Sequence, residues 1–170
     1  YWPNSDQRMA MESARSLLSG DYSPWDAVGF VYASPMVPLG YAYTYPSQNG
    51  LILFLAVIVM IFRDLTPYAV QILNIGFLFG GVYFLSCLAV RLFGLKSIRG
   101  ILILTFACLP FAFYITFVYG TMPGFCLSSA ALYFVYRYIE TEKLSRFFIA
   151  AVTAAVSVLL KSNYLIVLVA

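Results

Sequence analysis

Two ionisable side chains stand out because of their positions in the sequence. Asp6 is the first acid of the chain, in the segment Asn4-Ser5-Asp6-Gln7-Arg8, and Lys161 interrupts an otherwise apolar stretch near the other end. A carboxylate acts as a general base when its pKa and geometry suit the proton that it takes. An ammonium at membrane depth is costly, so it is a functional hypothesis by default, and phosphate is a suitable partner for it.

Each of these candidates also has a purely structural interpretation. The helix dipole favours an acid in the first turn of a helix, which alone would explain Asp6. A lysine at a helix end extends its amine toward water, which would explain Lys161. A third candidate, YPSQNG at residues 45–50, offers amides and backbone N–H groups before an apolar run. A helix that begins near Pro46 explains that segment more simply.

Several classes of chemistry are excluded by residues that the chain lacks. It has no histidine, which removes histidine acid–base catalysis and histidine metal ligands. Its cysteines, Cys87, Cys108 and Cys126, all lie in apolar runs and are interpreted as small core residues rather than a disulfide framework. No Walker loop, dinucleotide fingerprint or cysteine-rich metal pattern is present. The net charge of +3, without a basic run, argues against nucleic acid as a partner.

The elements that must position these residues belong to a membrane protein. Of the 170 residues, 62% are hydrophobic and 10% are charged, whereas soluble domains average about 45–50% and about 25%. We therefore expect an all-α polytopic protein that passes the membrane several times, most simply the cell membrane. Because residue 1 is not Met and residue 170 falls inside an apolar run, we interpret the chain as a fragment of a longer single domain.

Residues 1–50 are predicted to form a loop outside the hydrocarbon, since they hold five of the eight prolines and four of the seven acids. Asn4 or Ser5 can cap a helix that starts at Asp6, and Gly20 can end it. The apolar residues of this segment fall roughly on one face, which predicts a short amphipathic helix able to lie on a membrane surface. Residues 21–50, interrupted by Pro and Gly, are predicted as a non-helical loop packed at the interface.

Residues 51–170 are predicted to form transmembrane helices, placed at residues 65–90, 98–118, 122–138 and 147–160, with residues 164–170 starting another. Residues 51–62 are twelve apolar residues, a length more typical of an interfacial or re-entrant segment, and we favour that they do not cross. If the helix begins at Pro46, the run reaches about 17 residues and would just cross.

The positive-inside rule orients these helices. Two loops hold three basic residues each: Arg91, Lys96 and Arg99, then Arg137, Lys143 and Arg146. The hairpin between them, at residues 119–124, carries no charge, so both basic loops are predicted to be cytoplasmic and the hairpin to be outside. Residues 147–160 rise only about 21 Å, less than a hydrocarbon core of about 30 Å. Lys161 would then lie in the outer half of the membrane, on the side predicted for Asp6.

In chain order, these segments resemble the GT-C superfamily of membrane glycosyltransferases, and within it the family 39 group of protein mannosyltransferases and aminoarabinose transferases. The matching segments are Ser5-Asp6-Gln7, Gly20-Asp21-Tyr22, YPSQNG at residues 45–50, Arg91-Leu92-Phe93-Gly94, Val118-Tyr119-Gly120-Thr121 and Leu159-Leu160-Lys161-Ser162-Asn163. They span nearly the whole chain, although the motifs are loose. The resemblance implies a GT-C-like helix bundle whose outer first loop carries the short amphipathic helix.

The resemblance also implies an activity and roles for particular residues. It implies an inverting transfer of a sugar from a polyprenyl-phosphate donor to an acceptor at the outer face, in a single displacement. Asp6 would be the catalytic base or electrostatic partner, and Lys161 or Arg8 would bind the donor phosphate. The substrate-binding residues that it implies are Gln7, Tyr45, Gln48, Asn49 and Thr121.

Two departures from the family pattern leave the cofactor and the acceptor open. Many relatives carry an acid in the outer hairpin, where this chain has Thr121, and some carry Glu-Lys where this chain has Thr44-Tyr45. No metal ligand is assigned, and dependence on a divalent metal stays an alternative. A different class of function also stays open, a non-enzymatic polytopic transporter or lipid-handling protein. The acid-bearing loop before a short helix favours the enzyme, because transporters more often place charges in mid-span.

Overall fold

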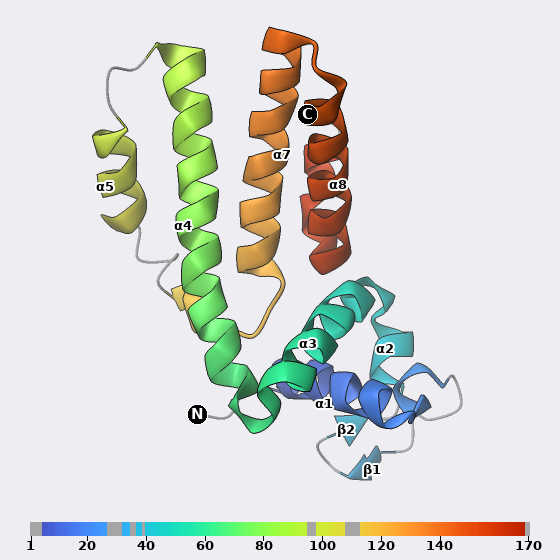
Figure 1. Cartoon of the computed structure of the whole chain (residues 1–170). Helices are drawn as coiled ribbons and strands as arrows, with labels where there is room; N and C mark the ends of the chain where they lie inside the picture. Colours follow the sequence, from blue (N-terminus) through green and yellow to red (C-terminus); the bar gives the residue numbers. More distant parts are fainter. Residues whose placement is uncertain are drawn as a thin grey trace. The chain divides into compact units, whose positions relative to one another are not determined.

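The computed structural model describes residues 5–26, 32–34, 37–38, 40–94, 98–107 and 113–168 (Figure 1). The chain divides into two compact units. Unit 1 comprises Tyr1–Ile72 and Phe117–Tyr119, and unit 2 comprises Leu73–Thr116 and Gly120–Ala170. Each unit has its own cluster of buried apolar side chains.

Most of the described chain is helical. Unit 1 contains α1 (Ser5–Ser19), η1 (Ser23–Trp25), β1 (Tyr32–Ser34), β2 (Val37–Pro38), α2 (Tyr41–Thr44), η2 (Pro46–Gln48), α3 (Asn49–Phe62), η3 (Arg63–Leu65) and the first turns of α4 (Thr66–Phe93). The two strands pair antiparallel, with Tyr32 opposite Pro38 and Ser34 opposite Val37. Unit 2 contains the rest of α4, α5 (Arg99–Ala107), α7 (Thr121–Thr141), α8 (Leu144–Leu160) and η4 (Ser162–Leu168).

Helix α1 lies where the sequence predicts the amphipathic helix. Asp6 is in its first turn, where the positive end of the helix dipole favours a carboxylate. Gly20 follows with φ +80°, a left-handed conformation that only glycine adopts without strain. One face of α1 is buried, including Met9, Ala10 and Ala14.

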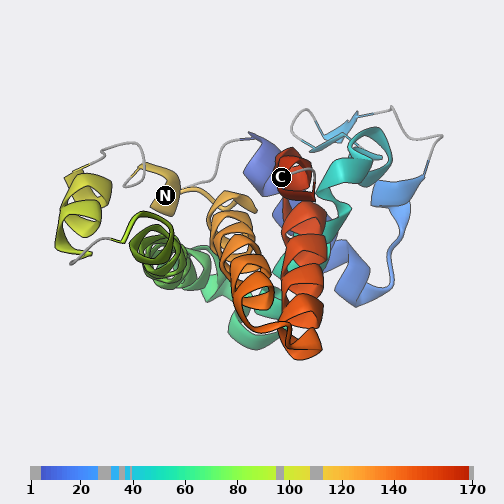
Figure 2. The same cartoon turned by 90° about the horizontal axis from the view of Figure 1, so that it is seen from above.

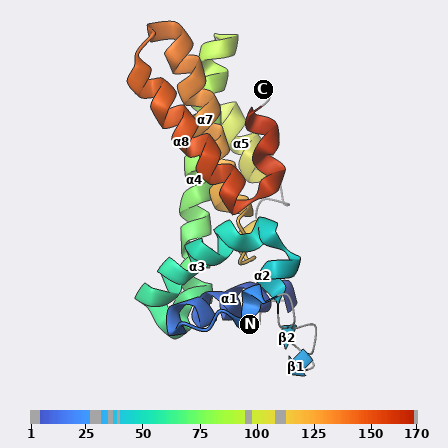
Figure 3. The same cartoon turned by 90° about the vertical axis from the view of Figure 1, so that its right-hand side faces the viewer.

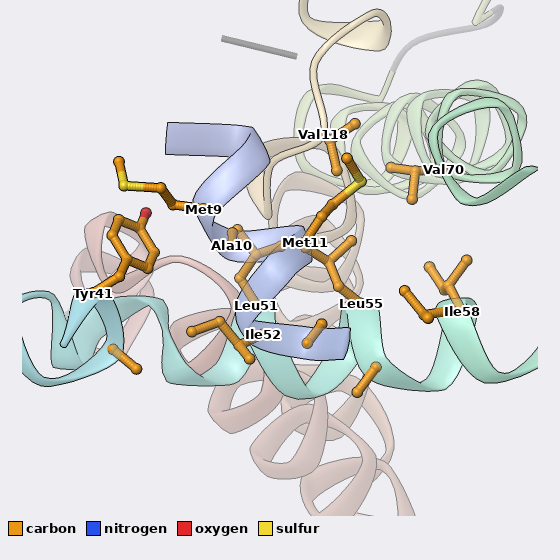
Figure 4. Close-up of a cluster of buried hydrophobic side chains, with 14 of the residues drawn as sticks. Met9, Ala10, Met11, Tyr41, Leu51, Ile52, Leu55, Ile58, Val70 and Val118 are labelled. Carbon is orange, nitrogen blue, oxygen red and sulfur yellow. The ribbon is translucent and has the colours of Figure 1, made fainter. Parts of the chain in front are cut away.

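The core of unit 1 lies between α1 and α3. Figure 4 shows Ala10 and Met11 of α1 beside Leu51, Ile52 and Leu55 of α3. These five side chains are all buried. The apolar face of α1 is therefore covered by α3, which corrects the expectation that α1 presents this face to a membrane.

A sharp break separates α3 from α4. Arg63 has φ 50°, which is uncommon for a residue other than glycine. The hydroxyl of Thr66 donates a hydrogen bond to the backbone carbonyl of Arg63. Asp64, in the same turn, lies 3.7 Å from the guanidinium of Arg15 on α1. The long apolar stretch is thus divided into two helices, and the first of them belongs entirely to unit 1.

The helices of unit 2 lie in the order α5, α4, α7, α8 (Figures 1 and 2). Two glycines let α4 approach α7 closely. A Cβ atom at Gly81 would lie 2.4 Å from a ring carbon of Phe125, and one at Gly80 would lie 2.8 Å from the sulfur of Cys126. One turn further along, the ring of Phe84 contacts that of Tyr133 at 5.7 Å between centroids.

Helices α7 and α8 run antiparallel beside each other (Figure 3). At the end where they connect, Glu140 accepts hydrogen bonds from Arg91 at 3.0 Å and from Arg137 at 2.8 Å. Arg146 donates to the backbone carbonyl of Arg137 at 3.1 Å. Residues of both predicted basic loops therefore lie together at one end of unit 2.

Fewer helices than predicted meet the requirements of a membrane span. Among the described residues, one helical stretch, Pro46–Phe93, is long and apolar enough to cross, and Leu144–Leu160 is apolar but shorter. The break at Arg63 lies inside the longer stretch, so α4, with its 28 residues, is the helix with spanning length. At 1.5 Å per residue it is about 42 Å long.

Three predicted segments differ from those observed. The helix predicted over residues 98–118 is seen as α5, which ends at Ala107, and residues 116–120 form a turn; residues 108–112 lie outside the described part. The apolar helix predicted at residues 164–170 is instead the 3-10 helix η4, Ser162–Leu168. Residues 21–50 are not wholly non-helical, because Pro24 and Pro46 stand in the first turns of η1 and η2, where a fixed φ suits a helical turn.

Candidate active site

The carboxylate of Asp6 is exposed at the start of α1 and has a defined partner. The hydroxyl of Tyr119 donates a hydrogen bond to Oδ2 of Asp6 at 3.3 Å. This bond is longer than the usual limit of about 3.0 Å for O–H···O contacts, so it orients the carboxylate without holding it tightly. The second oxygen of the carboxylate is available to a substrate on the exposed side of the helix.

A second hydrogen bond brings the segment that carries Tyr119 to α1. The side chain of Gln7 is fully buried, and its Oε1 accepts the backbone N–H of Val118 at 3.1 Å. Val118 itself is buried in the core between α1 and α3. Gln7 therefore has a structural role, and we do not retain it among the proposed substrate-binding residues.

Tyrosine side chains surround this carboxylate. Tyr41 is buried, and burial, followed by the negative charge of Asp6, raises the pKa of its hydroxyl above the ordinary value of 10.0. Its ring contacts that of Tyr45 at 5.2 Å between centroids, and Tyr45 is exposed. Asp6, Tyr41, Tyr45 and Tyr119 are here called the Asp6 cluster, and all of them lie in unit 1. A neutral hydroxyl, a carboxylate and exposed aromatic faces together suit a polar ligand that also has an apolar face, such as a sugar.

The other predicted residues of unit 1 are engaged in local contacts. Arg8 pairs with Glu12, one turn along α1, at 2.8 Å. The pair is partly exposed, and such i, i+4 pairs contribute only about 0.3–0.5 kcal/mol, so a phosphate could displace Glu12. Asn49 accepts a hydrogen bond from the indole N–H of Trp25 at 3.2 Å. Gln48 is half-buried, and its backbone N–H bonds to the carbonyl of Tyr45 at 2.9 Å.

Thr121 and Lys161 belong to unit 2, where they lie at one end of the α7–α8 pair. The carbonyl of Thr121 accepts a hydrogen bond from the hydroxyl of Tyr164 at 2.9 Å. The backbone N–H of Tyr164 in turn bonds to the carbonyl of Lys161 at 3.0 Å. Lys161 is the half-buried residue that ends α8. The two predicted residues thus come together, at the end of unit 2 opposite to Arg137 and Glu140.

Sequence reasoning missed Tyr119 and Tyr41. Tyr119 could have been found, because it stands beside Gly120 in the uncharged hairpin that was predicted to share the outer side with Asp6. Tyr41 gave no such signal, since it is one of several tyrosines in a segment without a regular pattern.

Comparisons with family models, curated proteins and solved structures found no match to the chain. Among the residues that the structure describes, no three His, Cys, Asp or Glu side chains gather in a way that could hold a metal ion.

Proposed function

We propose that this chain belongs to a membrane glycosyltransferase of the GT-C type, which moves a sugar from a polyprenyl-phosphate donor to an acceptor at the outer face. The observation that carries the proposal is the Asp6 cluster. An exposed carboxylate stands at a helix start, with a tyrosine hydroxyl on one oxygen and an exposed aromatic ring nearby. That combination suits an acceptor hydroxyl, which needs a base, and a sugar ring, which packs on aromatic faces.

The exposed surface of the helices supports a location in the membrane. Large apolar side chains face outward on α4 and α8: Phe79, Tyr83, Phe148, Val152 and Leu159. Soluble monomers rarely expose contiguous apolar patches larger than a few hundred Å². The arginines gather at one end of unit 2, which the positive-inside rule assigns to the cytoplasm. Thr121 and Lys161, at the opposite end, then face outward.

The proposed reaction is a single displacement. Asp6 accepts the proton of the acceptor hydroxyl, whose oxygen forms a bond to the anomeric carbon of the donor sugar. The bond between that carbon and the donor phosphate oxygen breaks, and polyprenyl phosphate leaves. Tyr119 orients the Asp6 carboxylate, and Arg8 or Lys161 balances the charge that develops on the phosphate.

The test replaces Asp6 with asparagine in the intact protein in nanodiscs and follows transfer of labelled sugar from a panel of polyprenyl-phosphate sugars. Loss of a general base typically lowers a rate by about 10²–10⁴-fold, and we expect a decrease of that size in kcat. Asp21→Asn is the matched control, because Asp21 is an exposed acid of the same unit that hydrogen-bonds to its neighbour Ser23. Turnover that survives Asp6→Asn would remove Asp6 from the mechanism, and the helix dipole would then suffice to explain it.

A further inference from the structure

Helix α3 has two apolar faces, and only one of them is covered. Its buried face, at Leu51, Leu55 and Ile58, packs in the core beneath α1 (Figure 4). Its other face exposes the side chains of Leu53, Val57, Met60 and Ile61, with exposed fractions of 58%, 54%, 63% and 63%. These residues recur at intervals of four, three and one, which forms a continuous stripe along one side of a helix. This stripe is here called the open face of α3.

The charges of the pair lie on the other helix. Between Asn49 and Phe62 α3 carries no charged residue, whereas α1 carries Arg8, Glu12 and Arg15 with partly exposed side chains. The pair is therefore apolar on the α3 side and charged on the α1 side. A surface of this kind matches the boundary between hydrocarbon and water, where one side is apolar and the other is hydrated.

The length of the contact between α1 and α3 decides how the pair can be placed. The buried residues of α3 run from Leu51 to Val59, so the contact extends over most of the helix. Arg15 of α1 lies 3.7 Å from Asp64, just beyond the end of α3. If α3 crossed the membrane, α1 would accompany it and its charged side chains would enter hydrocarbon, at a cost of roughly 2.5–3.5 kcal/mol each. In addition, the 14 residues of α3 rise only about 21 Å, less than a hydrocarbon core of about 30 Å.

We propose that α1 and α3 form a two-layer platform in the plane of the membrane surface, with the open face of α3 in lipid and the charged face of α1 in water. The occupant of the open face is thus the acyl region of a bilayer, and the platform holds the Asp6 cluster at the height of lipid headgroups. The inference rests on the membrane location in the proposed function and is independent of sugar transfer.

The test measures the depth of single spin labels in nanodiscs. Cysteines are introduced one at a time at Leu53, Val57, Met60 and Ile61, in a background without native cysteines. Collision rates with oxygen, which concentrates in lipid, and with a water-soluble nickel chelate give the depth of each label. In a platform that lies flat, all four labels prefer oxygen and their depths agree within about 6 Å, the radius of a helix with its side chains. A label at Arg15 should prefer the nickel chelate.

Control labels on α8 use its own exposed stripe: Phe148, Val152, Val156 and Leu159. As α8 is proposed to run across the membrane, its labels should differ in depth by about 16 Å over eleven residues. A depth difference of about 12 Å between Leu53 and Ile61 would mean that α3 crosses, and would overturn the inference. Nickel access at all four α3 positions, or shielding from both reagents, would also overturn it, because water or protein would then cover the open face. A failed α8 gradient would count against the membrane location itself, whereas loss of sugar transfer would not bear on either result.

Discussion

Replacement of Gln7 by leucine should release the 117–119 segment from α1. The Gln7 side chain is fully buried, and its Oε1 accepts the backbone N–H of Val118 at 3.1 Å. Leucine fills a similar volume but offers no acceptor, so the N–H of Val118 would lose this partner inside the core. A buried donor without a partner costs about 1–3 kcal/mol.

This cost can be read as hydrogen exchange at the 117–119 segment. Because a factor of ten corresponds to about 1.4 kcal/mol, we expect the Val118 amide to exchange roughly 5- to 150-fold faster in Gln7→Leu. The measurement is exchange followed by mass spectrometry in nanodiscs, on peptides that cover residues 117–119. Tyr119 lies in the same segment, so the orientation of Asp6 and hence kcat should decrease with it.

Ser13→Ala is the matched control, because Ser13 is also a buried polar residue of α1, six positions further along. It should leave exchange in the 117–119 peptides unchanged. The reasoning is refuted if Gln7→Leu exchanges there at the wild-type rate. Equal acceleration across the α1 and α3 peptides would also contradict it, because the whole of unit 1 would then have opened.

Three further predictions concern other parts of the chain. Burial raises the pKa of Tyr41, so the folded state holds that proton more tightly than the unfolded chain. The stability of unit 1 should therefore decline as pH rises above about 10, and thermal melts from pH 8 to 11 should show no such decline of Tyr41 origin in Tyr41→Phe. Gly81→Ala should destabilise unit 2 by about 1–3 kcal/mol through overlap with Phe125. Gly76→Ala on the same helix, where a Cβ meets nothing within 4 Å, should instead stabilise by about 0.5–1 kcal/mol; equal melting temperatures for the two would contradict the close approach of α4 and α7. Lys161→Ala should weaken the dependence on polyprenyl-phosphate donor in steady-state kinetics, and Lys161→Arg should keep part of it, whereas an unchanged donor dependence in Lys161→Ala would leave only a snorkelling role.

Local sequence signals predicted the helices best. The predicted helix at residues 122–138 is observed as Thr121–Thr141, and the one at residues 147–160 as Leu144–Leu160. Pro123 in a first turn and the polar residues between the two helices are features of a few neighbouring positions, so they can be read without knowledge of the fold. α1 was predictable for the same reason, since Asp6 and Gly20 mark its two ends.

The sequence could not show which face of α3 is covered. Its residues from Leu51 to Phe62 are uniformly apolar, so no polar positions mark one side as exposed. The contacts of the Asp6 cluster were equally hidden, because Gln7 and Val118 are 111 positions apart and Asp6 and Tyr119 are 113 apart. Contacts at such separations depend on tertiary packing, which no local pattern in a single sequence records.

The most direct test of the proposed function uses proteoliposomes that contain the intact protein and a polyprenyl-phosphate sugar labelled in both its sugar and its lipid. We predict that the sugar label moves to an acceptor and that polyprenyl phosphate accumulates in equal amount, and that Asp6→Asn stops both. Movement of the lipid to the other leaflet with its sugar still attached, or binding without any separation of the two labels, would contradict the proposal and assign the chain to a lipid-handling protein.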